Sequence, residues 1–440
     1  MKTRFIILLF FTLPGYLHAD TLTEVIQHTL ETNPEVLISI NTRRAADQEF
    51  KQAQSGYWPT IELRGGYGRE NSDNATTRNR TGGDISLTRQ EMGISLSQML
   101  FDGFSVKHGV ARQNSLVNSA AYKVQNTHEN IALITAEVYL EILRRWELLE
   151  LSKNNVVIHQ KTLQQIRTLV KGGAGRKADV KQSTSRLALA KSSLVNADGN
   201  LRNAEINYQR ITGELPKSPK TLSIPPPAPL EAALPQNVNT ALDIALNKHP
   251  SLQVVKAELE AAFSANRQAK SNFLPRMFLE LDATDNKNLD GVAGDNDDMS
   301  AMLTMRYNLF RGGADKARSQ ETAERIGVAK EETRRIRRII EEKVQLSWNS
   351  LRTIRARLDS LKIHLESTED VLQSYKEQFK LGQRSLLDVL DSENELFNAR
   401  ASLVSAQYNE ILSIFRVLES SGLLLETLGI ERANESQVNY

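Results

Sequence analysis

Hydrophobic positions recur every seven residues along two long stretches of this chain, and a glycine-containing turn divides each stretch in two. A period of seven kept over several heptads predicts helices that supercoil around one another. Each half of the chain should therefore end in an antiparallel helical hairpin. In the first half these positions are Ile142, Leu149, Val156, Leu163 and Val170, then Val180, Leu187, Leu194, Leu201 and Tyr208. In the second half they are Leu351, Leu358, Leu365, Leu372 and Phe379, then Val389, Leu396, Leu403 and Val417, with Glu410 as the exception.

Four shorter segments alternate with a period of two, which predicts β-strands at 60–69, 85–101, 276–283 and 299–310. In 299–310 the apolar side chains fall mainly on one face, and Met302 breaks the alternation. The polar stretches 70–84 and 284–298 predict loops. Such strand pairs are typical of a transmembrane barrel with a wet lumen. An ordinary half-buried sheet has the same alternation, so the pattern alone leaves both open.

The prolines show that the chain is duplicated. Asn33-Pro34 and Trp58-Pro59 recur 216 positions later as His249-Pro250 and Leu274-Pro275. Helices are expected at 22–57 and 238–273, where Pro59 and Pro275 stop them. A further helix over 104–171 would be roughly 100 Å long at 1.5 Å per residue.

These signals divide the chain into five segments. We expect a first repeat at 20–213, a proline-rich and extended linker at 214–237, a second repeat at 238–425 and a polar C-terminal tail at 426–440. Residues 1–19 have the order of a secretory signal peptide, which is a basic start, an apolar run and a small-residue end at Ala19.

After the signal peptide no run of about 18 apolar residues follows, so no transmembrane helix is expected. A mature chain that crosses a membrane would then have to do so as a closed β-barrel, because lipid cannot satisfy open backbone groups. Four strands cannot close a barrel, whose smallest form has about eight. The sequence therefore predicts association, most simply with symmetry.

Composition excludes several functions. The formal charge is +2, and loss of Lys2 and Arg4 with the signal would leave basic and acidic residues equal in number, which gives no global attraction to nucleic acid. There is no cysteine, so thiolate metal sites, disulfides and an N-terminal lipid anchor are excluded.

The order, spacing and duplication of these elements resemble the TolC family of outer-membrane exit ducts. The resemblance rests on the proline motifs above, on Leu100-Phe101-Asp102-Gly103 and Leu309-Phe310-Arg311-Gly312, and on the run 382–391, and it covers 20–425. It implies a mostly α-helical trimer whose twelve strands form one outer-membrane β-barrel and whose coiled-coil helices continue as a periplasmic tunnel. It also implies a periplasmic adaptor and an inner-membrane ABC transporter or other pump as partners. The run 379–397 is similar to the branch that serves type I protein secretion, including adhesins and toxins, and the alternative is small-molecule efflux.

The glycine turns mark candidate docking tips for the adaptor. Glycine permits a tight reversal and leaves room for a partner helix, although it would equally serve only to end a helix. The candidate docking residues are Val170, Gly172, Gly173, Gly175, Leu381 and Gly382.

Asp388 and Asp391 stand three apart and so share one helix face, where a trimer would gather six carboxylates. Ser385 and Asp388 also fit a capping box, and spacing alone does not separate a gate from a helix cap. The resemblance favours a periplasmic gate, with Arg384 linked to the acid at Asp179. Ala178 departs from relatives that have a hydroxyl at this position.

Other chemistry is weakly supported. Gly172–Lys177 lacks the Gly-Lys-Ser/Thr ending of a phosphate loop, no catalytic zinc or serine motif occurs, and neither enzyme activity nor a cofactor is expected. The acidic residues of 285–298 fit no calcium-loop spacing. The rival from another class is a periplasmic coiled-coil adaptor or scaffold, which explains the heptads and the signal but not the four strands.

Overall fold

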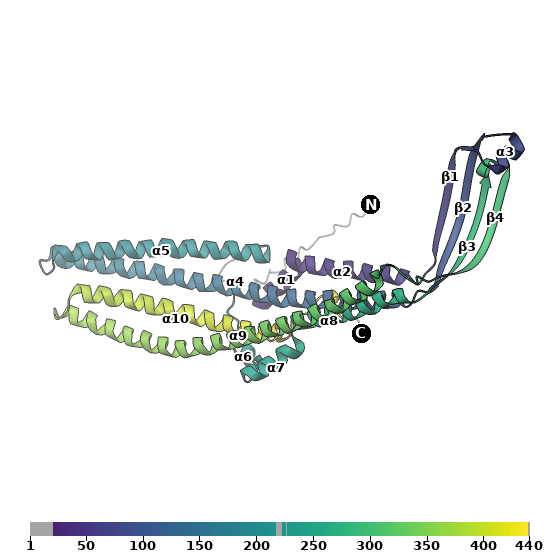
Figure 1. Cartoon of the computed structure of the whole chain (residues 1–440). Coiled ribbons are helices and arrows are strands. Elements are labelled where there is room, and N and C mark those ends of the chain that lie inside the picture. Colours follow the sequence, from purple (N-terminus) through teal and green to yellow (C-terminus); the bar gives the residue numbers. More distant parts are fainter. Residues whose placement is uncertain (1–20, 217–221, 226, 439–440) are drawn as a thin grey trace, which may run out of the picture. The chain divides into compact units, whose positions relative to one another are not determined.

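The computed structural model describes residues 21–216, 222–225 and 227–438, so the predicted signal peptide lies outside the described residues. The chain is mostly helical with one small antiparallel sheet (Figure 1). The helices are α1 (Leu22–Thr32), α2 (Pro34–Ser55), α3 (Ala75–Thr81), α4 (Ser105–Lys171), α5 (Lys177–Thr212), α6 (Pro227–Ala233), α7 (Val238–Lys248), α8 (Pro250–Lys270), α9 (Ala314–Lys380), α10 (Leu386–Ser420) and α11 (Leu424–Leu428). The strands are β1 (Thr60–Ser72), β2 (Ile85–Phe101), β3 (Arg276–Lys287) and β4 (Asp295–Arg306).

Contacts divide the chain into two compact units. We name the first, residues 1–37, 128–245 and 342–432, the hairpin unit, and the second, residues 38–127, 246–341 and 433–440, the sheet unit. The long helices α4 and α9 contribute to both. This division cuts across the two sequence repeats, whose boundaries stay a prediction.

The helices expected at 22–57 and 238–273 are each two helices. The breaks fall at Asn33 and His249, whose ψ angles of 129° and 125° are not helical. A residue before proline is pushed out of the helical region, while the proline itself suits the first position of the next helix. The prolines at 34 and 250 thus start α2 and α8. In the linker, expected to be extended, α6 forms because its prolines lie in the first turn, where N–H groups have no helical partner.

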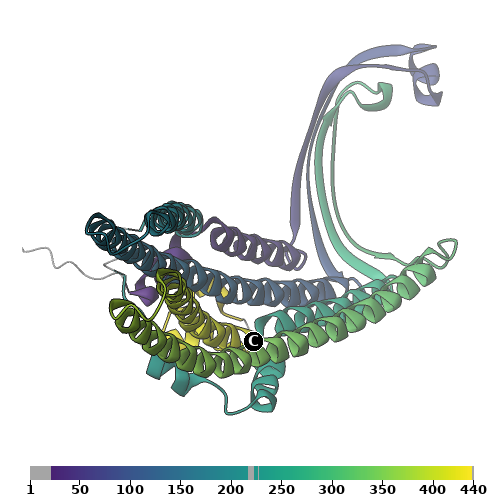
Figure 2. The same ribbon diagram turned by 90° about the vertical axis from the view of Figure 1, so that its left-hand side faces the viewer.

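The sheet has the order β1-β2-β3-β4 with every neighbouring pair antiparallel, and Figure 2 shows it as one curved sheet. Its strands are longer than their apolar segments and take up part of the polar stretches expected to be loops: β1 reaches Ser72, β3 reaches Lys287 and β4 begins at Asp295. Backbone hydrogen bonds between two strands can continue through polar residues, because they do not depend on the side chains. The loop at 70–84 also contains α3, which Asn74 caps. At its other end β4 stops at Arg306, so Tyr307 and Leu309 lie beyond it.

The two faces of the sheet differ in chemistry. One register row joins Ile61, Leu96, Leu281 and Ala301, and the next joins Leu63, Ile94, Ala283 and Met299. The other face carries ion pairs, with Arg64 at 3.6 Å from Asp282 and Arg306 at 3.0 Å from Glu280. The predicted alternation is therefore a division between an apolar face and a charged face. Many of the apolar side chains are exposed in the single chain, as Leu63, Ile94, Met299 and Leu303 show.

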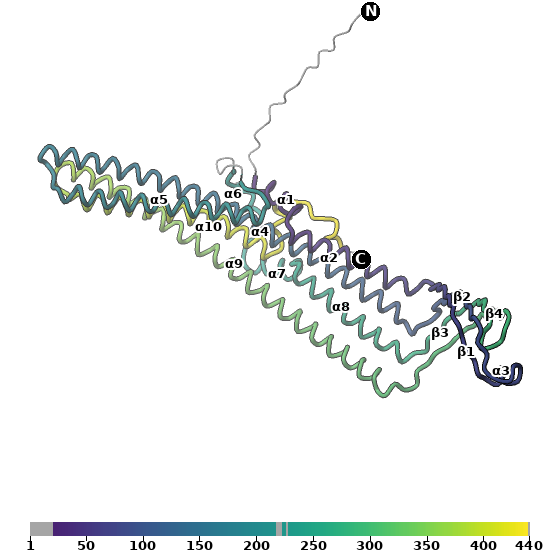
Figure 3. The backbone as a smooth tube through the Cα atoms, turned by 90° about the horizontal axis from the view of Figure 1, so that it is seen from above, coloured from purple at the N-terminus to yellow at the C-terminus, as the bar shows by residue number. Residues whose placement is uncertain are grey.

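In the hairpin unit, α4 pairs with α5 and α9 pairs with α10, and the chain reverses at one tip of each pair (Figures 1 and 3). The heptad positions pack inward: Ile142, Leu149, Val156 and Leu163 on α4 are all buried, as are Leu351, Leu358 and Leu372 on α9. Among the described residues, no helix is both long enough and apolar enough to span a bilayer.

Candidate functional site

The first hairpin tip is the turn between α4 and α5. Gly173 has a φ of +80°, which favours glycine. At Gly175 an added Cβ would lie 2.8 Å from a Cγ of Val170, so this position must stay small for the turn to close. Gly172 has ordinary space around it. The backbone therefore explains two of the three predicted glycines without a partner protein.

The second tip, the turn between α9 and α10, carries an exposed apolar side chain. Gly382 has a φ of +73° and donates its N–H to the carbonyl of Phe379 at 3.0 Å. Beside it the Leu381 side chain is 72% exposed.

An apolar cluster of residues from all four helices lies just inside the two tips. Ile166, Leu386 and Leu390 are buried there, and Val170, Val180 and Phe379 pack against them with partial burial. Val170, predicted as a docking residue, thus has a packing role within the hairpin unit. The cluster holds the two tips of one chain together.

The predicted gate residues are engaged within the chain. Asp388 accepts the Ser385 hydroxyl at 2.8 Å and forms the capping box of α10. Arg384 lies 3.9 Å from Asp388, and its guanidinium stacks on the Tyr375 ring at 4.0 Å. Asp391 is ion-paired with Arg186 of α5.

Asp179 plays the same capping part on α5, where its carboxylate accepts the N–H of Arg176 at 3.2 Å. Among the residues that the structure describes, Arg384 has partners in its own turn, and its link to Asp179 stays a prediction.

Two buried ionisable groups were missed by sequence reasoning. His159 of α4 and Glu393 of α10 are each only 4% exposed, with Nδ1 and Oε2 3.8 Å apart, and Lys376 of α9 lies 3.2 Å from the other Glu393 oxygen. Burial lowers the pKa of His159, as does the nearby Arg186, whereas Glu393 opposes the shift. The available signal was a polar residue inside an apolar helix stripe.

A third missed group is Glu129, buried on α4. Its carboxylate lies 3.0 Å from Arg432 and accepts the N–H of Leu425 at 3.4 Å, so it holds the segment around α11. Burial raises the pKa of Glu129 to about 7, against the opposing effect of Arg432. Glu419, another buried carboxylate, is paired with Lys343 at 2.6 Å.

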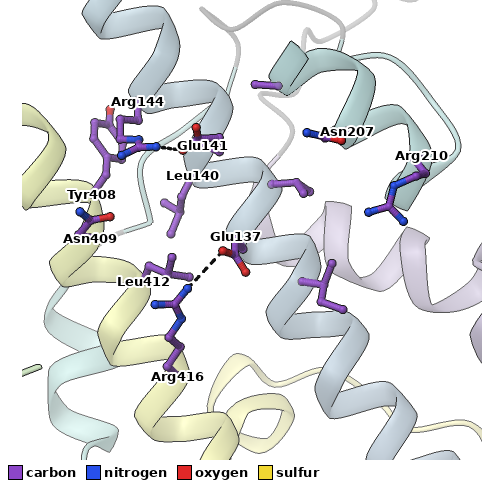
Figure 4. A pocket seen from close by; sticks show the side chains of 13 residues that line it. Glu137, Leu140, Glu141, Arg144, Asn207, Arg210, Tyr408, Asn409, Leu412 and Arg416 are labelled. Atoms are coloured by element: carbon purple, nitrogen blue, oxygen red, sulfur yellow. Dashed lines mark hydrogen bonds and ion pairs between the residues drawn. The ribbon is translucent and has the colours of Figure 1, made fainter. Parts of the chain in front are cut away.

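A polar cleft of about 470 Å³ lies between α4, α5 and α10 of the hairpin unit (Figure 4). Within it Arg416 pairs with Glu137 at 3.2 Å and Arg144 pairs with Glu141 at 2.5 Å. Most of its charge is therefore satisfied internally. No group of three metal-ligating side chains occurs among the described residues, and the aspartates of 285–298 lie mainly on β3 and β4.

The comparisons with known proteins agree with this architecture. The chain is 25% identical over 417 residues to the outer membrane efflux protein BepC of Brucella suis biovar 1 (strain 1330), covering 94% of this chain and 88% of that protein. It is 23% identical to the outer membrane protein TolC of Escherichia coli (strain K12), covering 97% and 87%. The crystal structure of CusC superposes with a TM-score of 0.80 at 15% identity, covering 91% of each chain.

Long helical hairpins joined to a two-faced sheet are the fold of an outer-membrane channel. Residues 25–214 and 241–413 match the family model described as outer membrane efflux protein, and the chain belongs to this family. The predicted TolC-family resemblance and fold class are confirmed. The protein is a channel of this family, not an enzyme, located in the Gram-negative outer membrane and extending into the periplasm. The adaptor or scaffold interpretation is thereby excluded.

Proposed function

We propose that this protein is the outer-membrane exit duct of a tripartite type I secretion system, which exports a protein such as a large adhesin or toxin. Its partners would be a periplasmic adaptor and an inner-membrane ABC transporter. The choice of cargo class rests on the resemblance of the run 379–397 to the type I secretion branch. Relatives of both kinds align along most of the chain: the alkaline protease secretion protein AprF of Pseudomonas aeruginosa with 90% of it, and the efflux protein BepC with 94%.

A homotrimer is the assembly that the sheet supports best. Strands β1 and β4 are the two edges of a four-stranded sheet, so each has a row of backbone groups without a strand partner in the single chain. Such edges must pair in lipid, where water is not available to them. Three copies joined edge to edge would give twelve strands, with the apolar face toward lipid and the face of Arg64 and Arg306 toward the lumen.

The periplasmic gate is proposed at Asp388 and Asp391, with Arg384 and Asp179 as supporting charges. Capping of α10 by Asp388 is compatible with a gate, because a cap fixes the carboxylate in place. In a trimer these aspartates would gather around the axis, where clustered carboxylates resist full ionisation and bind multivalent cations.

The adaptor is proposed to dock at the two tips, chiefly on Leu381 beside Gly382, with Gly172, Gly173 and Gly175 shaping the other tip. Val170 contributes by fixing that tip and not by direct contact. The repeat boundaries 20–213 and 238–425, the linker 214–237, the tail 426–440 and the cleaved signal 1–19 belong to the same proposal.

Deletion of the gene in its host tests the choice of cargo. Protein in the culture supernatant and susceptibility to toxic small molecules are measured together, with the wild-type gene restored on a plasmid as control. We expect one abundant secreted protein to disappear from the medium and to return on complementation. Unchanged secretion with raised susceptibility to small molecules would overturn secretion in favour of efflux.

A further inference from the structure

The buried stripe of α4 that leads from Val156 to the tip is apolar except at His159. On α4 the inward stripe runs Val156, His159, Leu163 and Ile166 at helical spacings of three and four, and the three apolar members are buried. On α10 the facing stripe runs Leu386, Leu390 and Glu393. A histidine and a glutamate thus stand where packing alone would place leucines.

These two polar side chains meet each other without completing a hydrogen bond. His159 Nδ1 and Glu393 Oε2 are 3.8 Å apart, and both atoms are buried without a hydrogen-bond partner. The second oxygen of Glu393 is held by Lys376 of α9 at 3.2 Å. A buried polar atom without a hydrogen-bond partner loses its hydration without compensation, so this layer is weaker than an apolar layer would be.

The fourth helix, α5, also contributes a charged residue near His159 and Glu393. Arg186 of α5 pairs with Asp391, two residues before Glu393 on α10, and its charge also acts on His159. All four helices therefore contribute charged or titratable groups: His159 from α4, Arg186 from α5, Lys376 from α9, and both Asp391 and Glu393 from α10.

We propose that His159, Glu393 and Lys376 form a buried polar clamp between the two hairpins, which positions Asp391 at the gate and keeps the closed tips separable. A polar pair in an apolar seam fixes register at the expense of stability. An all-apolar seam would hold the hairpins more tightly than export permits. The clamp rests on the proposed gate. Its three residues are additional to those proposed for the gate.

Protonation of His159 should make channel opening depend on pH. The groups that face His159 are Glu393 from α10 and Arg186 from α5, with Lys376 of α9 neutralising Glu393 from its other side. Because burial lowers the pKa of His159, a proton is bound more readily when the hairpins separate and the ring reaches water. Acidification below about pH 6.5, the ordinary histidine value, should therefore favour opening.

The clamp is tested on the purified full-length trimer in planar bilayers, by recording open probability from pH 7.5 to pH 5. The variants are Glu393→Gln, His159→Gln and the double variant His159→Leu with Glu393→Leu. The matched control is Glu395→Gln, two residues along α10 on its exposed side.

We expect Glu393→Gln to raise the open probability at pH 7.5 at least threefold, and Glu395→Gln to leave it unchanged. The double leucine variant should have a lower open probability than wild type and should lose the response to pH. A merely structural defect would not produce this combination. His159→Gln should also lose the pH response. If the wild type conducts and Glu393→Gln has the same open probability as Glu395→Gln, the clamp is overturned. If the wild type does not conduct, the proposed function itself is overturned.

Discussion

Charge on the apolar face of the sheet should block membrane assembly, and β4 offers a matched pair of sites. Leu303 and Met302 are adjacent, and their side chains are 62% and 56% exposed in the single chain. They lie on opposite faces, since Leu303 is in register with Leu279 and Met302 with Glu280. Leu303→Arg and Met302→Arg therefore differ only in the face that receives the charge.

The size of the effect follows from where Leu303 lies. The apolar rows of Met305 and Ala301 flank it, and the first aspartate on this face of β4 is Asp297. An arginine facing lipid near the middle of a barrel wall costs about 2–4 kcal/mol. This is a loss of about 30-fold to about 700-fold in the assembly equilibrium for each chain. On the other face, Met302→Arg would lie beside Glu280, where an exposed ion pair changes stability by less than about 1 kcal/mol.

The assay is the fraction of chain recovered as trimer in the outer membrane, measured on unheated gels at low expression. Leu303→Arg should leave little trimer, while Met302→Arg should match wild type. Equal recovery of both variants, or a greater loss with Met302→Arg, would refute the assignment of the two faces.

Three further outcomes are expected. Asp388→Ala combined with Asp391→Ala should abolish block of reconstituted channels by multivalent cations added on the periplasmic side, and persistent block would leave these residues as helix caps. Leu381→Glu should abolish export while the trimer persists, and normal export would end the docking role. Because the pKa of Glu129 is raised from 4.5 to about 7 in the folded chain, its stabilising contribution is complete below about pH 4.5 and is lost as the pH rises through about 7. The shift corresponds to about 3 kcal/mol, and Glu129→Gln should flatten this part of the melting temperature against pH; an unchanged slope would show that another group titrates.

The parts of this fold that could be predicted are those whose hydrophobic pattern has a single structural explanation. Alternation gave the strands because a pleated sheet has a period of two, and heptads gave the hairpins because a supercoiled seam has a period of seven. The strand ends at Ser72 and Lys287 were not predictable, because backbone pairing extends a ladder into polar sequence. The break at Asn33 carried a usable signal in Pro34.

The site was predictable only in part. The cap at Asp388 and the turn at Gly382 could be predicted because caps and turns have local signatures, while their roles in a gate and in docking stay predictions. His159 and Glu393 were missed because each is an ordinary polar residue in its own helix, and only the packing of α4 against α10 brings them together. Glu129 was missed for the same reason, since Arg432 lies 303 positions further along the chain.

The central claim is that copies of this chain close one barrel through their sheet edges, and the absence of cysteine makes that directly measurable. Within one chain β1 and β4 are separated by two strands, roughly 14 Å at about 4.8 Å per step, which is beyond the reach of a disulfide. Glu62→Cys is combined in turn with Ser300→Cys, Met302→Cys and Thr304→Cys, all on the charged face, and each pair is oxidised in the outer membrane. The account predicts that at least one pair yields covalent trimers, which a reducing agent converts to monomers. Chains with a single cysteine should yield no covalent trimers. Monomers from every pair would contradict it.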